Sequence, residues 1–241
     1  MLSGEGAGDG LPDPNIVFLI AALNEEAGIG MTLSELRKLP LDPYLLVVDG
    51  NSADGTVDVA RNLKADIIMQ DRVKGKGAAI SQGLEYLRDL GLQCDYLAFI
   101  DADYTYPAEH VPSMIEVLRN DRSVGMVVGD RFDTARDYRK SMPRVFYYGN
   151  RLLALSHNIL NGVGLKDPLS GLRVVRWEIL RDWKPKSKSF DIEVELNHRV
   201  VEQGYSIVEV PILYRPRLGH KKLKPKHGLT ILSRIMTESL A

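Results

Sequence analysis

This sequence of 241 residues lacks several features that mark large classes of protein. It has one cysteine, Cys94, which excludes an internal disulfide and fits a reduced cytosolic setting. No apolar run approaches the ~18 residues that a membrane-spanning helix needs. The formal net charge of −1 gives no electrostatic basis for binding nucleic acid, so we expect no nucleic-acid partner.

Familiar catalytic patterns are also missing. The five histidines have no metal-ligand spacing, and the chain has no Ser-His-Asp order and no nucleophile elbow. The glycine-containing segment Lys74-Gly75-Lys76-Gly77 matches neither the dinucleotide-binding pattern nor the ATPase loop. The chemistry must therefore be sought in other residues.

The composition predicts one substantial core. Hydrophobic residues make up 44% of the chain and charged residues 26%, which is ordinary for a globular protein. Residues 1–14 are rich in glycine, proline and acids and have no basic residue, which predicts a flexible tail and not a signal peptide. We expect the core within residues 15–225, followed by an amphipathic helix over 226–241.

Short apolar runs alternate with helical periodicity from Ile16 onward. This alternation predicts an α/β fold in which helices flank a mostly parallel central sheet, with ligands beyond the carboxyl ends of its strands. Strands are expected at 16–22, 44–48, 66–69, 96–100, 124–129, 171–175 and 206–213, and helices at 25–38, 55–63, 76–90, 108–119, 145–160, 191–202 and from about 228.

The segment Asp101-Ala102-Asp103 ends the apolar run 96–100, a predicted buried strand. Two carboxylates at i and i+2 on extended chain project to the same side, where they repel each other. A hard divalent cation removes this repulsion, and oxygen ligands suit Mg²⁺ or Mn²⁺. Because Mg²⁺ leaves positions for phosphate oxygens, the motif predicts a metal-bound diphosphate and a nucleotide substrate. Taken alone, it could equally be an acidic turn.

Several other loops fall where this fold places ligands. Asn24 and Glu25 follow the first strand, and Asp49 ends the second strand, where it could contact a base or ribose. Asp54 could cap the next helix, which is its favoured role, or contact the ligand. Lys76 opens a helix whose N-terminus could bind phosphate, although solvated lysines in a surface turn would look the same.

The second half of the chain contributes hydroxyl, acidic and basic groups. Segment 167–173 joins a turn to Ser170 and Arg173, and arginine suits bidentate binding of phosphate. Glu193 could act in the site or simply favour the start of its helix. Residues 215–227 are strongly basic.

Together these loops resemble the family-2 glycosyltransferases of the GT-A fold, in particular the group of dolichyl-phosphate mannose and glucose synthases. The resemblance covers roughly residues 16–225, and seven motifs in the same order make it specific. The matching segments are Ala22-Leu23-Asn24-Glu25-Glu26, Val48-Asp49 with Asp54-Gly55-Thr56, Gly75-Lys76-Gly77, Asp101-Ala102-Asp103, Gly129-Asp130-Arg131, Asp167 to Arg173, and Arg217 to Leu223.

The resemblance implies a metal-dependent hexosyltransferase whose GT-A catalytic domain spans 15–225. The donor would be a nucleotide sugar, the acceptor a polyprenyl or dolichyl phosphate, and the cofactor Mg²⁺ or Mn²⁺. The implied catalytic residues are Asp101, Asp103 and Arg131, of which Asp101 and Asp103 hold the metal. The donor would be bound by Ala22, Asn24, Glu25, Asp49, Asp54, Lys76, Asp101, Ala102, Asp103 and Lys222, and the acceptor phosphate by Arg131, Arg144, Ser170 and Arg173.

The expected reaction inverts the sugar. Because the acceptor phosphate is already an anion near pH 7, it needs no strong base, whereas a sugar hydroxyl would need one and Glu193 would be the first candidate. A membrane would deliver the acceptor, so we expect a cytoplasmic protein peripheral at the cytoplasmic face, contacting the surface through its basic segment and last helix. That helix could instead pack on the core.

Some positions depart from the family pattern. Ala21 replaces a usual proline, and Thr105 stands where mannose synthases place a glutamine. Asp49-Gly50-Asn51-Ser52 replaces Asp-Asp-Gly-Ser, and the loss of the second acid favours a UDP-sugar over GDP-mannose. The alternatives are a glycosyltransferase with a soluble acceptor and, with less support, a sugar-phosphate nucleotidyltransferase, whose glycine-rich N-terminal loop is absent.

Overall fold

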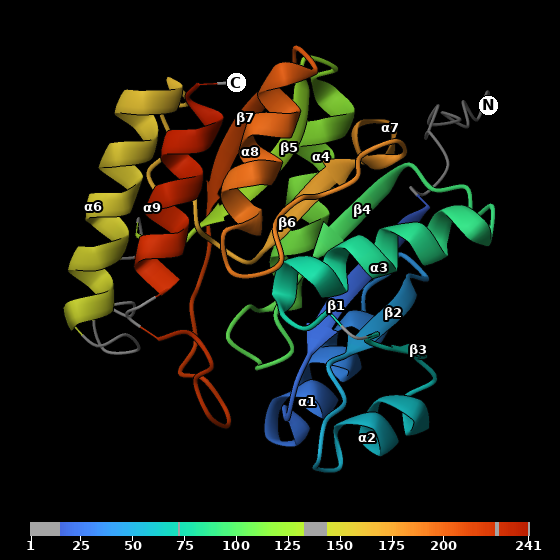
Figure 1. The fold of residues 1–241 in the computed structure, drawn as a ribbon. Coiled ribbons are helices and arrows are strands. Elements are labelled where there is room, and N and C mark those ends of the chain that lie inside the picture. Colours follow the sequence, from blue (N-terminus) through green and yellow to red (C-terminus); the bar gives the residue numbers. More distant parts are fainter. Residues whose placement is uncertain (1–14, 72, 133–143, 225–226, 241) are drawn as a thin grey trace, which may run out of the picture.

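The computed structural model describes residues 15–71, 73–132, 144–224 and 227–240. The predicted tail at 1–14 lies outside the described residues, as does position 226, where the last helix was expected to start. In the described part, seven strands form one sheet in the order β3-β2-β1-β4-β6-β5-β7 (Figure 1). The strands are β1 (Ile16–Ala22), β2 (Tyr44–Asp49), β3 (Asp66–Met69), β4 (Tyr96–Phe99), β5 (Val124–Asp130), β6 (Arg173–Arg176) and β7 (Ser206–Pro211).

The sheet is parallel except at β6, which runs antiparallel to both of its neighbours, β4 and β5. All other neighbouring pairs are parallel, which confirms the predicted α/β class. The reversal places the residues before β6 at the same edge as the residues that follow the parallel strands. Segment 167–172 therefore meets the loops after β1, β4, β5 and β7.

Helices cover both faces of the sheet. One face packs against α1 (Glu26–Arg37), α2 (Thr56–Asn62) and α4 (Val111–Asn120), which follows a short 3-10 turn at Ala108–His110. The other face packs against α3 (Lys76–Asp89), α7 (Trp177–Leu180) and α8 (Ile192–Glu202). Trp177 of α7 is buried in this second layer.

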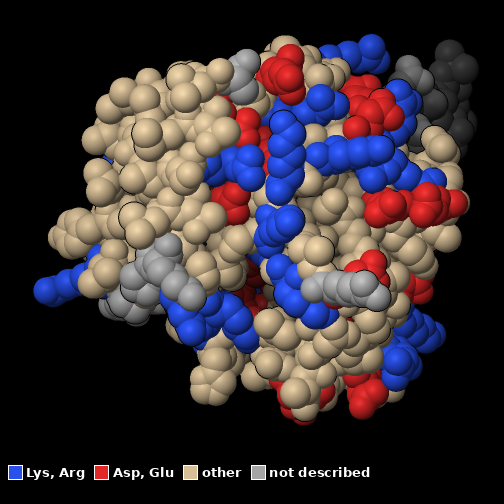
Figure 2. Space-filling model, viewed as in Figure 1, with Lys and Arg blue, Asp and Glu red and all other residues tan. Residues whose placement is uncertain are grey.

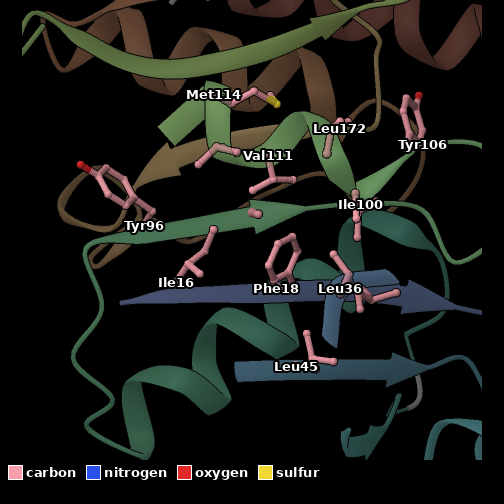
Figure 3. Packing of buried hydrophobic residues seen from close by; sticks show 14 of the residues in the cluster. Ile16, Phe18, Leu36, Leu45, Tyr96, Ile100, Tyr106, Val111, Met114 and Leu172 are labelled. Carbon is pink, nitrogen blue, oxygen red and sulfur yellow. The ribbon is translucent and has the colours of Figure 1, made fainter. Parts of the chain in front are cut away.

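Alternating side chains of the strands feed these two layers. In β1, Ile16, Phe18 and Ile20 point into the first layer, and Val17 and Leu19 point into the second. Figure 3 shows Phe18 of β1 close to Leu36 of α1, which belongs to the same buried cluster. All five residues are almost inaccessible to solvent, so the sheet is anchored on both sides and its carboxyl edge is a firm base for a site.

Two further helices form an outer layer, α6 (Arg144–Asn161) and α9 (His227–Glu238). They lie side by side at the end of the molecule beyond α8 (Figure 1). Ile231 and Ile235 of α9 pack against Val194 of α8 and Leu153 of α6. The last predicted helix therefore packs on the core through one face, while its Leu229 and Met236 remain exposed.

One local expectation was wrong. The strand predicted over 96–100 ends at Phe99, and Asp103 lies in a turn that continues through Tyr104, whose φ is 68°. The two acidic side chains therefore do not share a face through strand alternation. Within the turn, the Asp103 carboxylate is held by hydrogen bonds that it accepts from the backbone N–H and hydroxyl of Thr105 at 3.1 and 2.6 Å.

Candidate active site

A cavity of about 660 Å³ opens at the carboxyl edge of the sheet. Its walls come from the loops after β1, β4, β5 and β7, from the segment before β6 and from the start of α3. Nine residues considered from the sequence line it: Ala22, Glu25, Lys76, Asp101, Ala102, Asp103, Arg131, Glu193 and Lys222.

The Asp101-Ala102-Asp103 segment forms part of the cavity wall, and each carboxylate has a cationic partner. Lys76 Nζ lies 2.7 Å from Asp101 Oδ1, and Arg217 Nη1 lies 2.6 Å from Asp103 Oδ2. Burial acts to raise the pKa of Asp101, but the nearby Lys76 charge overrides it and holds the pKa below its usual value. Burial and the Asp101 charge raise the pKa of Asp103, against the effect of Arg217.

Lys76 is positioned at the first turn of α3 by the glycine before it. Gly75 has φ 120°, and a Cβ there would lie 2.2 Å from the carbonyl oxygen of Lys188, so no other residue fits without a shift. The Lys76 ammonium lies between Asp101 and Glu193, with each carboxylate at 2.7 Å. Despite burial, these two charges raise its pKa above the ordinary value, so Lys76 is a fixed cation.

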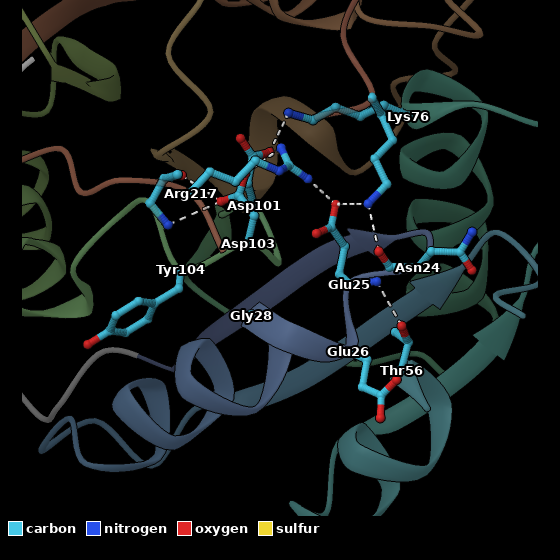
Figure 4. A network of polar contacts seen from close by, with 12 residues as sticks. Asn24, Glu25, Glu26, Gly28, Thr56, Lys76, Asp101, Asp103, Tyr104 and Arg217 are labelled. Carbon is cyan, nitrogen blue, oxygen red and sulfur yellow. Dashed lines mark hydrogen bonds and ion pairs between the residues drawn. The ribbon is translucent and has the colours of Figure 1, made fainter. Parts of the chain in front are cut away.

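A second group of charges surrounds Glu25 (Figure 4). Its Oε1 accepts from Arg217 and lies 2.8 Å from Lys222 Nζ, which also donates to the backbone carbonyl of Asn24 at 2.6 Å. Glu25 Oε2 is buried and has no hydrogen-bond partner among the described residues. Burial raises the pKa of Glu25 although Lys222 and Arg217 act to lower it.

The loop after β2 is held by its own side chains. Asp49 is fully buried, and its two oxygens accept from the Ser52 N–H and hydroxyl at 2.7 and 2.6 Å. Asn24 Oδ1 accepts from the Ala53 N–H at 2.7 Å. Asp54 accepts from the backbone N–H groups of Thr56 and Glu26, the first residues of α2 and α1. Asn24, Asp49 and Asp54 are thus not among the residues of the cavity wall. Asp54 accepts from the first N–H of α2, but the N-cap residue of that helix is Gly55.

Arg131 is a buried part of the cavity wall. Its Nε and Nη2 donate to the two carboxylate oxygens of Asp167 at 2.6 and 2.7 Å. Its guanidinium also lies over the ring of Tyr214, 5.3 Å from the centroid. Glu209 in turn accepts from the Asp167 N–H at 2.6 Å. This chain of contacts fixes the direction of Arg131.

Three residues proposed for the acceptor phosphate lie away from the cavity wall. Arg173 is buried and donates to the carbonyl of Ser170 and to Asn197 Oδ1, at 2.8 and 2.6 Å, so its guanidinium braces the segment before β6. Ser170, within that segment, is fully buried. Arg144 is exposed at the start of α6.

Several residues of the wall were not singled out from the sequence, among them Tyr106, Tyr214, Phe146 and Lys221. Tyr106, whose hydroxyl accepts from the Gly171 N–H at 2.7 Å, and Tyr214 lie beside Arg131. Lys221 Nζ lies 3.2 Å from the ring centroid of Phe146. The basic segment 215–227 indicated this region. Because Lys221 and Lys222 are adjacent and chemically identical, the sequence could not show that their contacts differ.

Lys221 differs from the other cations of the wall. Among the residues that the structure describes, it makes no ion pair, whereas Lys76, Arg217 and Lys222 each contact a carboxylate. Burial and the nearby charges of Arg131 and Arg217 lower its pKa to about 8. An exposed cation at the cavity wall that has no ion pair among the described residues is suited to bind an anionic ligand.

The acidic pair fits a divalent cation that is only partly held by protein. Asp101 and Asp103 supply the hard oxygen ligands that Mg²⁺ and Mn²⁺ prefer. Gly171 leaves room at Asp101, because a Cβ there would lie 2.6 Å from Asp101 Oδ2. No cluster of three or more potential ligands among His, Cys, Asp and Glu occurs in the described part of the chain. The remaining ligands must then come from elsewhere, as a bound diphosphate would provide.

The chain has named relatives over most of its length. It is 30% identical to the dolichyl-phosphate hexose transferase of Haloferax volcanii, with 89% of each protein covered. It is 29% identical to the undecaprenyl-phosphate mannosyltransferase of Micrococcus luteus, covering 86% of this chain and 87% of that protein. It is 26% identical to the polyprenol monophosphomannose synthase of Mycolicibacterium smegmatis, covering 92% and 85%.

A solved structure shares the fold. Glucosyl-3-phosphoglycerate synthase from Mycobacterium tuberculosis, in complex with Mg²⁺ and UDP, matches with a TM-score of 0.71 at 22% identity over 94% of this chain and 79% of that one. This likeness supports the GT-A arrangement of the sheet and helices. The family described as Glycosyl transferase family 2 matches residues 17–182. With its acidic pair, its cationic cavity and these relatives, the chain belongs to glycosyl transferase family 2.

Proposed function

We propose that this glycosyltransferase moves a hexose from a nucleotide-diphosphate sugar to a polyprenyl or dolichyl phosphate, with inversion at the anomeric carbon. The observation that carries the proposal is Lys221, which lines the cavity that also holds Asp101 and Asp103 and makes no ion pair with any residue that the structure describes. The names of relatives over 85% or more of their length, which specify dolichyl, undecaprenyl and polyprenol phosphate chemistry, support it.

The donor diphosphate would bind where the acidic pair meets Lys76, Arg217 and Lys222. A Mg²⁺ or Mn²⁺ ion held by Asp101 and Asp103 would neutralise charge on the leaving diphosphate. Arg217 and Lys222 now contact carboxylates and would turn part of their charge toward the diphosphate oxygens. Asn24, Asp49 and Asp54 would act by fixing the loops that hold the nucleotide.

The acceptor phosphate would bind on the other side, between Lys221 and Arg131. Positioning then supplies much of the catalysis, because the phosphate oxygen is an anion near pH 7 and needs no strong base. Glu193, the candidate base for a hydroxyl acceptor, is 2.7 Å from the Lys76 ammonium and 9% exposed at its side chain. The Glu193 carboxylate is thus already engaged by Lys76 and is not a free group facing a hydroxyl acceptor, which favours the phosphate acceptor.

The proposed donor is a UDP-sugar carrying glucose or N-acetylglucosamine, in preference to GDP-mannose. Guanine offers two adjacent donors that paired acids could accept, whereas uracil offers one N–H. The segment Asp49-Gly50-Asn51-Ser52 has a single acid, Asp49, whose oxygens already accept from Ser52. The related fold in complex with UDP is consistent with this preference. Calorimetry with UDP and GDP in Mn²⁺ tests it, and clearly tighter binding of GDP would reverse it.

We also propose a cytoplasmic location, peripheral at the cytoplasmic face of a membrane. In the described part of the chain, no helix is long and apolar enough to cross a bilayer. The acceptor class is what calls for a membrane surface, because polyprenyl phosphates reside in bilayers.

The test is a matrix of labelled donors and acceptors. UDP-glucose, UDP-N-acetylglucosamine and GDP-mannose are each incubated with polyprenyl phosphate, dolichyl phosphate or phosphoglyceric acid in the presence of Mn²⁺. We expect label in the lipid fraction, and none with the Asp103→Ala variant. Transfer to phosphoglyceric acid with none to either lipid would contradict the proposal and favour the soluble-acceptor alternative.

A further inference from the structure

The outer face of α6 carries a row of apolar side chains that no other part of the described structure covers. The row is spaced by three and four residues along the helix, so its members lie on one side. They are Val145, Tyr148, Leu152, Leu155 and Ile159, which are 71%, 68%, 65%, 57% and 72% exposed. We call this row the α6 stripe. It extends over about 21 Å at ~1.5 Å per residue.

The stripe is distinct from the face by which α6 packs on the protein. Ala154 and His157 are buried on the inner side, and Asn161 donates to a backbone carbonyl of α9 at 3.3 Å. Leu229 and Met236 of the neighbouring α9 are also exposed, at 74% and 55%. The molecule thus satisfies the inner face of this helix and leaves the outer face apolar, which marks an interaction surface.

The charge around the stripe has one sign. None of the residues of α6 is acidic, while Arg144 and Arg151 are exposed on it. The last acid of α9, Glu238, contacts Arg234 at 3.2 Å and has a side chain only 11% exposed. In Figure 2 the surface over α6 and α9 is almost free of charged residues, with blue residues along its lower border. Such a surface suits an apolar partner with anionic groups at its boundary.

The side of α6 opposite the stripe faces the cavity. Phe146 and Asn150 on the same helix line the cavity, as does Ile231 of α9. Lys221, the cation without an ion pair, lies against the Phe146 ring. An acceptor whose phosphate lies at Lys221 would therefore have its hydrocarbon chain leave the cavity beside the helix that carries the stripe.

We infer that the α6 stripe is the surface on which this protein docks to a fluid lipid bilayer with anionic head groups. The inference rests on the proposed function, since it places the membrane that supplies the lipid phosphate. The three-four spacing would also suit a helix of a second copy. The bilayer is favoured because the exposed charges of α6 in the described part of the chain are Arg144 and Arg151. In addition, the opposite side of the same helix lines the cavity in which the lipid phosphate would bind.

The test compares two double variants that add the same charge. Leu152→Glu with Leu155→Glu changes the stripe, and Met31→Glu with Leu90→Glu changes two residues of α1 and the end of α3 that are each 49% exposed. Flotation is measured with vesicles of phosphatidylcholine and phosphatidylglycerol, and with phosphatidylcholine alone. We expect the stripe variant to lose binding by about 10-fold or more and the control variant to float as the parent does.

Sugar transfer separates docking from chemistry. With polyprenyl phosphate embedded in vesicles, the rate of the stripe variant should fall along with its binding. With a short water-soluble isoprenyl phosphate, its rate should match the parent. Failure of the parent with both acceptors would sink the proposed function, while loss of flotation specific to the stripe variant would still support bilayer docking.

A third measurement does not depend on charge reversal. Leu155→Trp places an indole on the stripe, and Leu90→Trp is its control; the native Trp177 and Trp183 are buried and supply a constant background. Vesicles should shift the emission of the first variant to the blue and leave the second unchanged. Equal flotation of both double variants, or a parent dimer that becomes monomeric in the stripe variant without vesicle binding, would overturn the inference.

Discussion

The two sides of the cavity differ in how their charges are satisfied. On the side of the proposed donor, Asp101, Asp103 and Glu25 each contact at least one cation within hydrogen-bonding distance. On the side of the proposed acceptor, Lys221 has an aromatic ring beneath it, with no carboxylate partner among the described residues. The first side resembles a preorganised electrostatic framework, and the second resembles a place left for an anion.

This difference has a thermodynamic consequence. On the donor side, a bound metal diphosphate replaces existing ion pairs with contacts of similar strength, so the net change in free energy is small. On the acceptor side, Lys221 gains a contact with phosphate without giving up an ion pair among the described residues. Substitutions on the two sides should therefore change different kinetic parameters.

The largest expected effect is at Asp103. Asp103→Asn keeps the shape of the side chain and its contact with Thr105, but it removes the negative charge that would hold the metal. We expect transfer to fall about 1,000-fold, equivalent to ~4 kcal/mol in the barrier, and EDTA to have a similar effect on the parent. Asp58→Asn on the exposed face of α2 is the control. Full activity in EDTA would remove the metal from the mechanism.

The next effect should separate two adjacent lysines. Lys221→Met should raise the KM for the acceptor roughly 10- to 100-fold and leave the KM for the donor nearly unchanged, because a charge-assisted contact contributes about 1.5–3 kcal/mol. Lys221→Arg should restore most of the loss. Lys222→Met should act on the donor KM instead, since Lys222 contacts Glu25 and Asn24. If both Met variants changed the same KM values, the proposed division of the cavity into a donor side and an acceptor side would be wrong.

A smaller effect is expected from filling space beside Asp101. A Cβ at Gly171 would lie 2.6 Å from Asp101 Oδ2, so Gly171→Ala should push the carboxylate from its place. We expect about a 10-fold loss of transfer, with a thermal unfolding temperature close to that of the parent, because a side-chain end can move more readily than backbone. Gly149→Ala in α6 meets nothing within 4 Å and serves as the control. An unchanged dependence on Mn²⁺ concentration would argue against displacement of the carboxylate.

The smallest effect concerns pH. The pKa of Lys221 is lowered from 10.5 to about 8, so the side chain is charged below that pH and loses its charge above it. The KM for the acceptor in the parent should rise a few-fold as pH increases through about 8, since the neutral amine cannot pair with phosphate. Lys221→Arg stays charged and should flatten this rise. Steady-state kinetics from pH 7 to 9 would show whether the two proteins differ, and identical profiles would place the titration elsewhere.

Much of the sheet was predictable, because its signal is local. The bounds of β1 and β3 agree with the sequence prediction at both ends. β1 is a buried apolar run, whereas β3 is a short edge strand whose Ile67 and Ile68 are only partly buried. The antiparallel direction of β6 was not predicted. Strand direction depends on which neighbours a short segment pairs with, and Arg173–Arg176 carries no local sign of that choice.

The candidate site divides in the same way. Asp101, Asp103 and Lys76 were predicted as site residues because each lies next to a strong strand or helix signal, and all three line the cavity. It could not show that Asp49 and Arg173 are buried, since burial depends on segments distant in the chain. Both residues have side chains suited to a ligand, and the structure uses those groups to brace loops. The resemblance identified the motifs. The packing of the folded chain was needed to tell residues that can contact a ligand from residues that hold the loops in place.

The reversed strand β6 has a consequence for how the chain is made. β4 pairs with β1 on one side and with β6 on the other, and β5 pairs only with β6 and β7. On the ribosome, residues 16–99 can form half of the sheet while one edge of β4 waits for residues 173–176. At ~5–20 residues per second, that apolar edge stays open for several seconds of synthesis. Nascent chains arrested before Arg173 should therefore be the most demanding stage for chaperones, because an unpaired strand edge invites other chains to add to it.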